Sequence, residues 1–467
     1  LYGDEEASRH SETVFDIETL MAAASRRPEE LRNPEKNYTR VGRFRLAGLS
    51  SAFNLEEYLS LVDFPPGVDY LVIGQPEFFR ALSPIIKQVD LKDWKVFLMW
   101  NVLRFSSPYL HREAYMEYFD FYERKLTGKQ EPEKRWKFAV RVINRQLGEA
   151  LGRLYIEREF GENAKRQMEE LVDDLKQVFA KRLQNLDWLT DETKRRAIDK
   201  FSKFRAKIGY PSKFIDYSPV EIKREDLVGN MLRTNAFTFK REIGRIGSPV
   251  DKELWVMTPP TINAYFNPSN NEIVFPAGIL QPPFFNKNID IAVNYGAIGC
   301  VIAHEITHGF DDEGRKYDAD GNLKDWWEPE DEKKFKKKVG EISSLYGSIE
   351  ILPGLKVNGE LTLGENIADM GGVSIAFEAL QSRLSKMPEL RKIVDGFTPE
   401  QRFFIGWSQI WKQNERQELT KLRLTNDPHS PPSVRGSVPV WVHESFDNAF
   451  ADYKGDSTAK LPRIKVW

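Results

Sequence analysis

Cysteine is almost absent from this sequence. Cys300 is the single cysteine among 467 residues, so the chain can form no internal disulfide bond. Disulfides are typical of proteins from oxidising compartments, and their absence argues against a disulfide-bonded animal ectodomain. Bacterial secretion remains open on this evidence. By composition alone, Cys300 is predicted to be a small buried apolar residue.

Long apolar segments and an excess of charge of one sign are missing as well. No run of about 18 apolar residues occurs, so we expect no membrane segment in this chain. Lysine and arginine number 68 and aspartate and glutamate 70, for a net charge of -2. This balance lacks the basic excess typical of nucleic-acid binding, and no nucleic-acid partner is expected. With 41% hydrophobic and 30% charged residues, we expect a soluble globular monomer.

The first 205 residues are predicted to be mainly helical. Apolar residues recur there at spacings of three and four, which places them on one face of long helices. Beyond Gly209-Tyr210-Pro211, glycine and proline become denser, and a hairpin with Glu272–Phe275 as its second strand is predicted. The fold class is therefore mainly α with a smaller α+β part. We expect a helical domain over 1–205 and an α+β domain over 206–467. One such stripe is formed by Leu147, Ala150, Leu151, Leu154 and Tyr155, and another by Met168, Leu171, Leu175 and Phe179.

Three further helices are predicted in the second part. A helical pattern runs from about Ile291 to Asp312, and a second lies around Glu365 to Leu384. A third begins at Thr398, an N-cap residue followed by a proline in the first turn and by Gln401, which completes a capping box.

His304-Glu305-Ile306-Thr307-His308 has the pattern H-E-x-x-H. Two histidines four apart on a helix lie on the same face, one turn from each other. Their imidazoles can hold one zinc ion, and the glutamate between them can serve as a base for the metal-bound water. The sequence therefore predicts one Zn2+ per chain. A purely structural zinc is disfavoured, because such sites prefer four protein ligands and cysteine.

Two histidines leave a catalytic zinc short of its usual third protein ligand. Glu365 and Asp369 are four apart in a predicted helix and therefore share a face. One carboxylate could bind the metal while the other accepts a hydrogen bond from a ligand histidine. The same spacing is common on solvated helix faces, so spacing alone does not assign these roles.

Several longer motifs occur in a fixed order along the chain. Together they make it similar to the neprilysin family of zinc endopeptidases, which includes endothelin-converting enzyme and bacterial endopeptidase O. Because it has a single cysteine, the chain resembles a bacterial member. The motifs are Asn263-Ala264-Tyr265-Phe266-Asn267-Pro268, Phe275-Pro276-Ala277-Gly278, His304-Glu305-Ile306-Thr307-His308-Gly309-Phe310-Asp311-Asp312, Gly364-Glu365-Asn366-Ile367-Ala368-Asp369, and His429-Ser430-Pro431-Pro432 followed by Arg435.

The resemblance implies a role for each site residue. The implied zinc ligands are His304, His308 and Glu365. The implied catalytic residues are Glu305 as general base, Asp369 as partner of a ligand histidine, His429 as transition-state stabiliser, and Asp427, which orients His429. The implied substrate-binding residues are Asn263 and Ala264 for the peptide backbone, Arg435 for a substrate carbonyl, and an apolar pocket of Ile279, Phe284, Cys300, Val301, Ile410 and Trp411.

The resemblance also implies a thermolysin-like catalytic domain, capped by a helical domain that covers the active-site cleft. The expected activity is that of a zinc-dependent oligopeptidase, which cleaves small peptides on the amino side of hydrophobic residues with Glu305 as general base. The alternative is a catalytically silent peptide-binding protein that retains the fold. Intact Glu305, Glu365 and His429 argue against this alternative. One departure is that the family's Asp-Phe-Tyr motif, closely followed by Cys-Gly-x-Trp, does not occur in this sequence.

Overall fold

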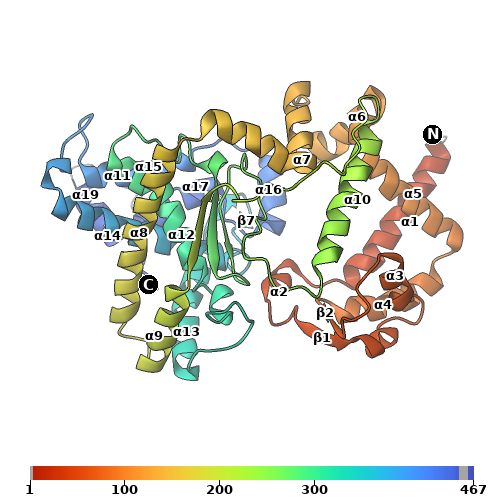
Figure 1. Ribbon diagram of the computed structural model, residues 1–467, viewed down its shortest axis with the longest axis horizontal. Coiled ribbons are helices and arrows are strands. Elements are labelled where there is room, and N and C mark those ends of the chain that lie inside the picture. The colour runs from red at the N-terminus through yellow and green to blue at the C-terminus, as the bar shows by residue number, and fades with distance from the viewer. Residues whose placement is uncertain (1–3, 452–460) are drawn as a thin grey trace. The chain divides into compact units, whose positions relative to one another are not determined.

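The computed structural model describes residues 4–451 and 461–467, and these form two compact units (Figure 1). Each unit combines segments that lie far apart in the sequence. The first contains residues 4–135 and 216–251. The second contains residues 136–215, 252–451 and 461–467.

The first unit is helical with one small sheet, in which β1 (Thr39–Gly42) pairs antiparallel with β2 (Tyr70–Ile73). Leu46, Leu49, Leu59 and Ile73 form its small apolar core. Its helices are α1 (Asp4–Ala23), α2 (Pro28–Arg32), α3 (Leu55–Leu61), α4 (Pro76–Gln88), α5 (Leu91–Ser106), α6 (Arg112–Tyr118) and α10 (Leu227–Arg245), with short 3-10 or π turns at Arg43–Gly48, Ser107–Tyr109 and Phe119–Lys125.

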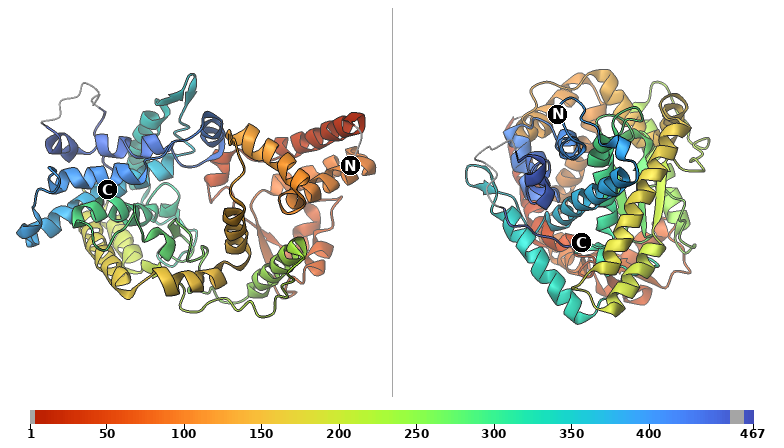
Figure 2. Two further views of the ribbon diagram at one scale, coloured as in Figure 1. Left: turned by 90° about the horizontal axis from the view of Figure 1, so that it is seen from above. Right: turned by 90° about the vertical axis from the view of Figure 1, so that its left-hand side faces the viewer.

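The second unit begins with three long helices, α7 (Arg135–Glu159), α8 (Glu162–Asn185) and α9 (Asp191–Ser202). The predicted apolar stripe of α8 is confirmed, because its residues are buried in the core of this unit. α8 packs against the later helix α14 (Leu363–Lys386), as both views in Figure 2 show.

This packing divides the chain differently from the expected boundary at residue 205. Residues 136–215 join the second unit, because Met168, Leu175 and Phe179 are completely buried in its core. Conversely, α10 belongs to the first unit, although it follows that boundary in the sequence. Composition along the chain predicts the type of each element, whereas the contacts of its apolar face decide which core it joins.

A three-stranded sheet lies in the second unit, in the order β3 (Arg205–Gly209), β5 (Glu272–Pro276), β4 (Tyr265–Asn267). β4 and β5 are antiparallel, which confirms the predicted hairpin, and β3 runs parallel to β5. The central strand β5 is buried throughout, as expected for a strand covered on both faces. β4 forms one edge of this sheet.

The predicted helix over residues 291–312 is a composite that ends earlier. It consists of α11 (Ile291–Asn294), a π-helical segment (Tyr295–Gly299) and α12 (Cys300–His308). The chain turns after His308, where the buried Lys200 ammonium donates to the carbonyls of Gly309, Gly314 and Tyr317 at 2.6, 2.7 and 2.8 Å. The lysine thus holds the segment that follows the helix in a turn.

The remaining elements complete the second unit. The predicted helix at Glu365 to Leu384 is confirmed as α14, and α15 (Pro399–Ile410) begins with the predicted capping box of Thr398 and Gln401. The others are α13 (Pro329–Gly347), β6 (Glu350–Leu352), β7 (Leu355–Lys356), α16 (Gln417–Asn426), α17 (Pro432–Arg435), α18 (Val438–Trp441) and α19 (Glu444–Ala449), with 3-10 turns at Ala277–Ile279, Gly314–Lys316 and Pro388–Leu390.

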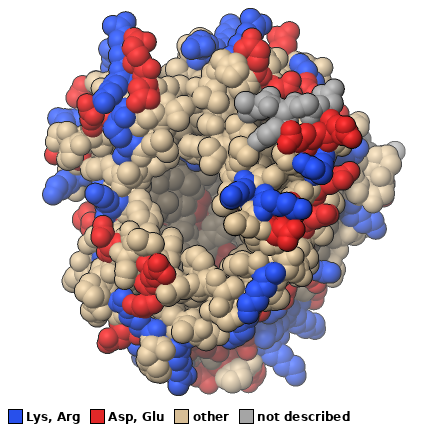
Figure 3. Space-filling view, turned by 90° about the vertical axis from the view of Figure 1, so that its right-hand side faces the viewer, with Lys and Arg blue, Asp and Glu red and all other residues tan. Residues whose placement is uncertain are grey.

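The distribution of charge and the apolar character of the helices bear on the expected partners. On the face in Figure 3, lysine and arginine side chains are interspersed with aspartate and glutamate rather than separated by sign. Within the described part of the chain, none of the helices has both the length and the apolar character needed to cross a bilayer.

Cys300 is a free, buried thiol.

Candidate metal centre and active site

Helix α12 brings His304 and His308 together. Their rings are nearly perpendicular, with centroids 4.5 Å apart, and their Nε2 atoms are separated by 3.0 Å. Both side chains are largely enclosed, with 7% and 16% of their surfaces exposed. The H-E-x-x-H spacing thus places two nitrogen donors on one face of the helix, as predicted.

Glu365, from the first turn of α14, supplies a carboxylate oxygen to the same point. Its Oε2 atom lies 3.3 Å from Nε2 of His304 and 3.6 Å from Nε2 of His308. This oxygen is buried, and within the described residues it has no hydrogen-bond partner. A tetrahedral zinc with bonds of about 2.1 Å separates its ligand atoms by about 3.4 Å. Two imidazoles and this carboxylate therefore fit zinc in both chemistry and spacing.

Glu305 offers a second carboxylate close to the two histidines. One of its oxygens lies within 4.8 Å of a ring nitrogen of each histidine. The side chain is buried, and burial raises the pKa of Glu305 above its ordinary value. Burial opposes ionisation of Glu365 too, but neighbouring His308 and His429 outweigh it and hold the pKa of Glu365 well below its usual range. The pKa values of the two carboxyl groups are thus shifted in opposite directions.

Two adjacent glycines allow α14 to approach α12 closely enough for these contacts. A Cβ atom on Gly372 would lie 2.6 Å from the carbonyl oxygen of Cys300, and one on Gly371 would lie 2.7 Å from Oγ1 of Thr307. Both distances are shorter than any normal carbon contact. The absence of side chains at these positions thus sets the distance between the helix with the histidines and the helix with Glu365.

Each histidine also has a carboxylate beside its other ring nitrogen. Nδ1 of His304 lies 2.8 Å from Oδ1 of Asp369, and Nδ1 of His308 lies 2.7 Å from Oδ2 of Asp311. Such partners fix the tautomer and ring orientation, so that both Nε2 atoms are left for a metal. Asp311 was missed in the sequence analysis, although its position three residues after His308 was an available signal.

His429 and Asp427 are brought together next to this centre, on the loop after α16. Nδ1 of His429 lies 2.8 Å from Oδ1 of Asp427, and Nε2 lies 3.3 Å from Oε1 of Glu365. Burial disfavours the charged form of Asp427, but its bonds with His429 lower the pKa of Asp427 overall. An ionised Asp427 therefore orients the imidazole, with its far nitrogen directed to the centre.

Arg435, on α17, is bound within the site. Its Nε and Nη2 atoms donate to Asp369 at 2.8 and 2.7 Å, and Nη2 lies 3.7 Å from Oε2 of Glu365. The guanidinium also stacks over the ring of Trp411, at 3.9 Å from its centroid. Arg435 thus supports the partner of His304, a contact that the sequence analysis did not anticipate.

Asn263 and Ala264 directly precede the edge strand β4. The Asn263 side chain is exposed, and its Oδ1 accepts a hydrogen bond from the Ala264 amide at 3.0 Å. An exposed amide at the start of an edge strand is suited to bind an extended peptide backbone.

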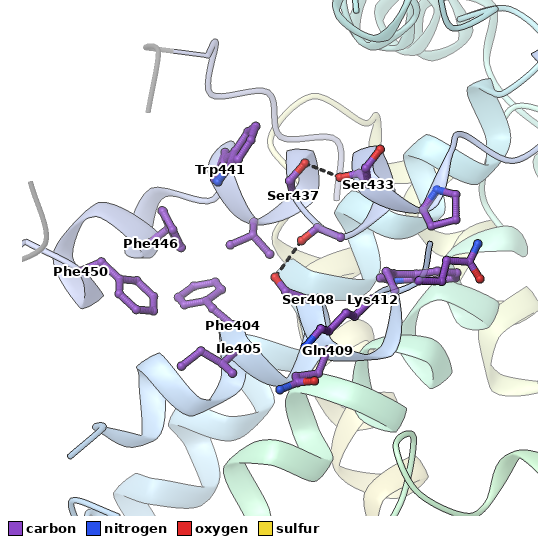
Figure 4. Close-up of a pocket in the computed structure, with 15 residues that line it drawn as sticks. Phe404, Ile405, Ser408, Gln409, Lys412, Ser433, Ser437, Trp441, Phe446 and Phe450 are labelled. Atoms are coloured by element: carbon purple, nitrogen blue, oxygen red, sulfur yellow. Dashed lines mark hydrogen bonds between the residues drawn. The ribbon is translucent and has the colours of Figure 1, made fainter. Parts of the chain in front are cut away.

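The six residues of the expected apolar pocket share one hydrophobic core. Cys300 and Ile279 are 0% and 3% exposed, and Trp411 is partly buried against the same core. Trp411 also lines an apolar pocket of about 530 Å3 between α15 and the segment from α17 to α19, where Phe404, Phe446 and Phe450 gather (Figure 4). The others in the core are Phe284, Val301 and Ile410.

The fold and this donor set are typical of a zinc metallopeptidase. Two models described as peptidase family M13 match the chain, one over residues 1–211 and one over residues 263–466. The chain is 32% identical over 487 residues to the endothelin-converting enzyme homolog of Locusta migratoria, covering 100% of this chain and 67% of that protein. It is 33% identical to endothelin-converting enzyme 1 of Mus musculus, of which it spans 62%, with all of this chain covered.

Solved structures agree with these sequence matches. The inhibitor complex of Mycobacterium tuberculosis zinc metalloprotease Zmp1 superposes with a TM-score of 0.94 at 39% identity, covering 99% of this chain and 71% of that one. PepO from Lactobacillus rhamnosis gives a TM-score of 0.91 at 26% identity, covering 100% and 72%. The chain belongs to peptidase family M13, whose members are zinc metallopeptidases. The expected resemblance and the expected mainly helical fold class are both confirmed.

Proposed function

We propose that this chain carries a zinc-dependent endopeptidase activity, which hydrolyses small peptides on the amino side of hydrophobic residues. The observation that carries the proposal is the buried oxygen of Glu365, without a hydrogen-bond partner among the described residues, at 3.3 and 3.6 Å from the two histidine nitrogens. Unpartnered buried oxygens are costly, and a metal ion would satisfy this one. The chain spans roughly two thirds of the length of these relatives. The proposal therefore rests on the residues of this site.

Glu305 acts as the general base in this proposal. When bound by His304, His308 and Glu365, zinc supplies a Lewis acid that makes water a stronger acid. Glu305 accepts the proton of the attacking water and later delivers it to the leaving amine. Its burial and raised pKa support this role, because a carboxylate that holds a proton more firmly is a better base.

His429 donates a hydrogen bond to the oxygen on which negative charge develops during attack. In its imidazolium form, His429 donates from Nδ1 to Asp427, which orients the ring, and carries a second proton on Nε2 for the substrate oxygen. A donor oriented before the reaction stabilises the transition state without the cost of reorganisation. Arg435 holds Asp369 and, through it, His304. Its contact with a substrate carbonyl rests on the family resemblance.

The substrate lies extended along β4 in this proposal. Asn263 binds its backbone, as a partner strand would be bound at a sheet edge. The hydrophobic preference follows from the apolar character of Val301, Ile410 and Trp411. The restriction to small peptides rests on the family resemblance.

Metal content and peptide cleavage, measured on the same preparations, test the proposal. We expect one zinc per chain, and cleavage of a quenched peptide with a large hydrophobic residue after the scissile bond. Glu305→Gln should retain the zinc and lose cleavage by about a thousandfold or more. If zinc binds while wild type and Glu305→Gln are equally inert toward a broad peptide library, the proposal is wrong and the silent peptide-binding alternative is supported.

A further inference from the structure

One buried hydrogen bond joins the loop that carries His429 to the helix that carries Glu365. Ser430 Oγ donates to Asn366 Oδ1 at 2.7 Å, and these residues are 2% and 0% exposed. Asn366 also donates from Nδ2 to Thr362 Oγ1 at 2.9 Å, so that its amide has partners on both sides. Ser430 directly follows His429, and Asn366 directly follows Glu365. The side chains of His429 and Glu365 themselves lie 3.3 Å apart.

His429 needs an external anchor, because its own contacts are mostly local. Its side chain is 43% exposed, compared with 17% for Glu365. The backbone amide and Nδ1 of His429 both bind Oδ1 of Asp427, at 2.9 and 2.8 Å. Since Asp427 lies on the same loop, these bonds shape the loop without attaching it to α14.

Other bonds hold the chain farther on. Nε1 of Trp407 donates to the carbonyl of Arg435 at 2.8 Å. Oγ of Ser408 donates to the carbonyl of Gly436 at 2.8 Å, a bond drawn in Figure 4. Both donors come from α15 and hold the end of α17, six or seven residues beyond His429. The bond between Ser430 and Asn366 is the contact that reaches α14 from the immediate neighbour of His429.

We propose that Asn366 and Ser430 are positioning residues, which hold His429 in register with the metal centre. This inference rests on the proposed function, in which His429 acts in the transition state. A displacement of about 1 Å at a catalytic group can cost about a hundredfold in rate. A contact made only in the transition state contributes to kcat and not to substrate binding. Loss of the hydrogen bond between Ser430 and Asn366 should therefore lower kcat and leave KM nearly unchanged.

Ser430→Ala removes the donor, and Ser437→Ala is a matched control. The Ser437 hydroxyl donates to the Ser433 carbonyl at 2.6 Å on the exposed side of the same segment (Figure 4). For Ser430→Ala we expect kcat to fall about tenfold or more, with KM within about twofold of wild type. A peptide with a tetrahedral phosphorus group at the scissile position, which mimics the transition state, should bind weaker by the same factor. Ser437→Ala should match wild type throughout.

Amide hydrogen exchange of the metal-free protein gives a second readout, independent of activity. The His429 amide should exchange faster in Ser430→Ala and in Asn366→Ala than in wild type or Ser437→Ala. Because the two residues share one bond, the double variant should lose no more kcat than the more affected single variant. If Asn366→Ala does not fold, the comparison of Ser430→Ala with Ser437→Ala decides alone.

Two results would overturn the inference: kcat and His429 exchange unchanged in Ser430→Ala, or a rise in KM with kcat preserved. Failure of the proposed function looks different, because the zinc-loaded wild type itself would then not cleave peptides. In that case, amide hydrogen exchange would still test whether the bond between Ser430 and Asn366 positions His429. Unchanged exchange at His429 would overturn the positioning role, and faster exchange would support it.

Discussion

Arg435 and Asp369 form a buried two-pronged ion pair, with Nε to Oδ2 at 2.8 Å and Nη2 to Oδ1 at 2.7 Å. Asp369 is almost fully enclosed, with 1% of its side chain exposed, and it also binds Nδ1 of His304. One carboxylate thus connects the arginine expected to bind substrate with a proposed metal ligand. A change at Arg435 should therefore be felt at the metal centre as well as by the substrate.

Arg435→Met should destabilise the protein and weaken zinc binding together. It leaves the Asp369 carboxylate buried without its main counter-charge, and breaking a buried pair in this way costs about 3–5 kcal/mol. Urea unfolding of the metal-free protein measures this cost. Arg224→Met, at a side chain that is 96% exposed, is the control and should change stability by less than about 0.5 kcal/mol. A stable Arg435→Met protein with normal zinc affinity would contradict the structural role.

Asp311→Asn should lower zinc affinity while the fold persists. Asp311 holds Nδ1 of His308, and loss of such a partner typically costs about 10–100-fold in metal affinity. Competition with a chelator measures the change. Asp173→Asn, at an exposed carboxylate on α8, should have no effect. Equal zinc affinities for the two variants would show that Asp311 does not tune His308.

Gly372→Ala should separate α12 from α14. The new methyl group would lie 2.6 Å from the Cys300 carbonyl, and such overpacking typically costs about 1–3 kcal/mol. Because the same contact sets the distance from the histidines to Glu365, zinc affinity should fall too. Gly340→Ala on α13, where a Cβ meets nothing within 4 Å, should be neutral or stabilise by up to about 1 kcal/mol. Thermal unfolding with and without zinc compares the two.

His443 should make the protein less stable at mildly acid pH. Burial beside Phe377 and Phe404 lowers the pKa of His443 from 6.5 to about 4. Between these values the unfolded chain binds a proton that the folded chain rejects. The contribution of neutral His443 to the free energy of unfolding is therefore complete above pH 6.5. It is lost as the pH drops toward 4, by up to about 3 kcal/mol.

Unfolding free energies of wild type and His443→Leu from pH 8 to pH 4 measure this loss. The wild-type curve should fall more steeply below pH 6.5, while His111→Gln, at an exposed histidine, should follow wild type. Parallel curves for wild type and His443→Leu would show that His443 does not carry the effect.

Local patterns predicted much of the site. The spacing of His304 and His308 fixed their common face, and the capping residues of α15 located its start. The distance between helices could not be read in this way. Residue spacing left Glu365 and Asp369 undecided as metal ligand, because their separation from α12 depends on the close approach at Gly371 and Gly372.

Partners that are distant in sequence were the harder part. The segment after α12 is held by Lys200, which lies more than a hundred residues earlier in the chain. Ser430 and Asn366 belong to two separate sequence motifs, and only the fold brings them together, where the loop meets α14. Likewise, the assignment of residues 136–215 to the second unit follows from where the stripe of α8 is buried, which periodicity does not specify.

The central claim is that Glu365, and not Glu305, is the carboxylate that completes the zinc site. Zinc titration of Glu365→Ala and Glu305→Ala tests it most directly, because both carboxylates lie near the same two histidines. We predict that Glu305→Ala binds one zinc with nearly wild-type affinity, whereas Glu365→Ala loses about a hundredfold or more. Retention of zinc by Glu365→Ala together with its loss from Glu305→Ala would contradict the account.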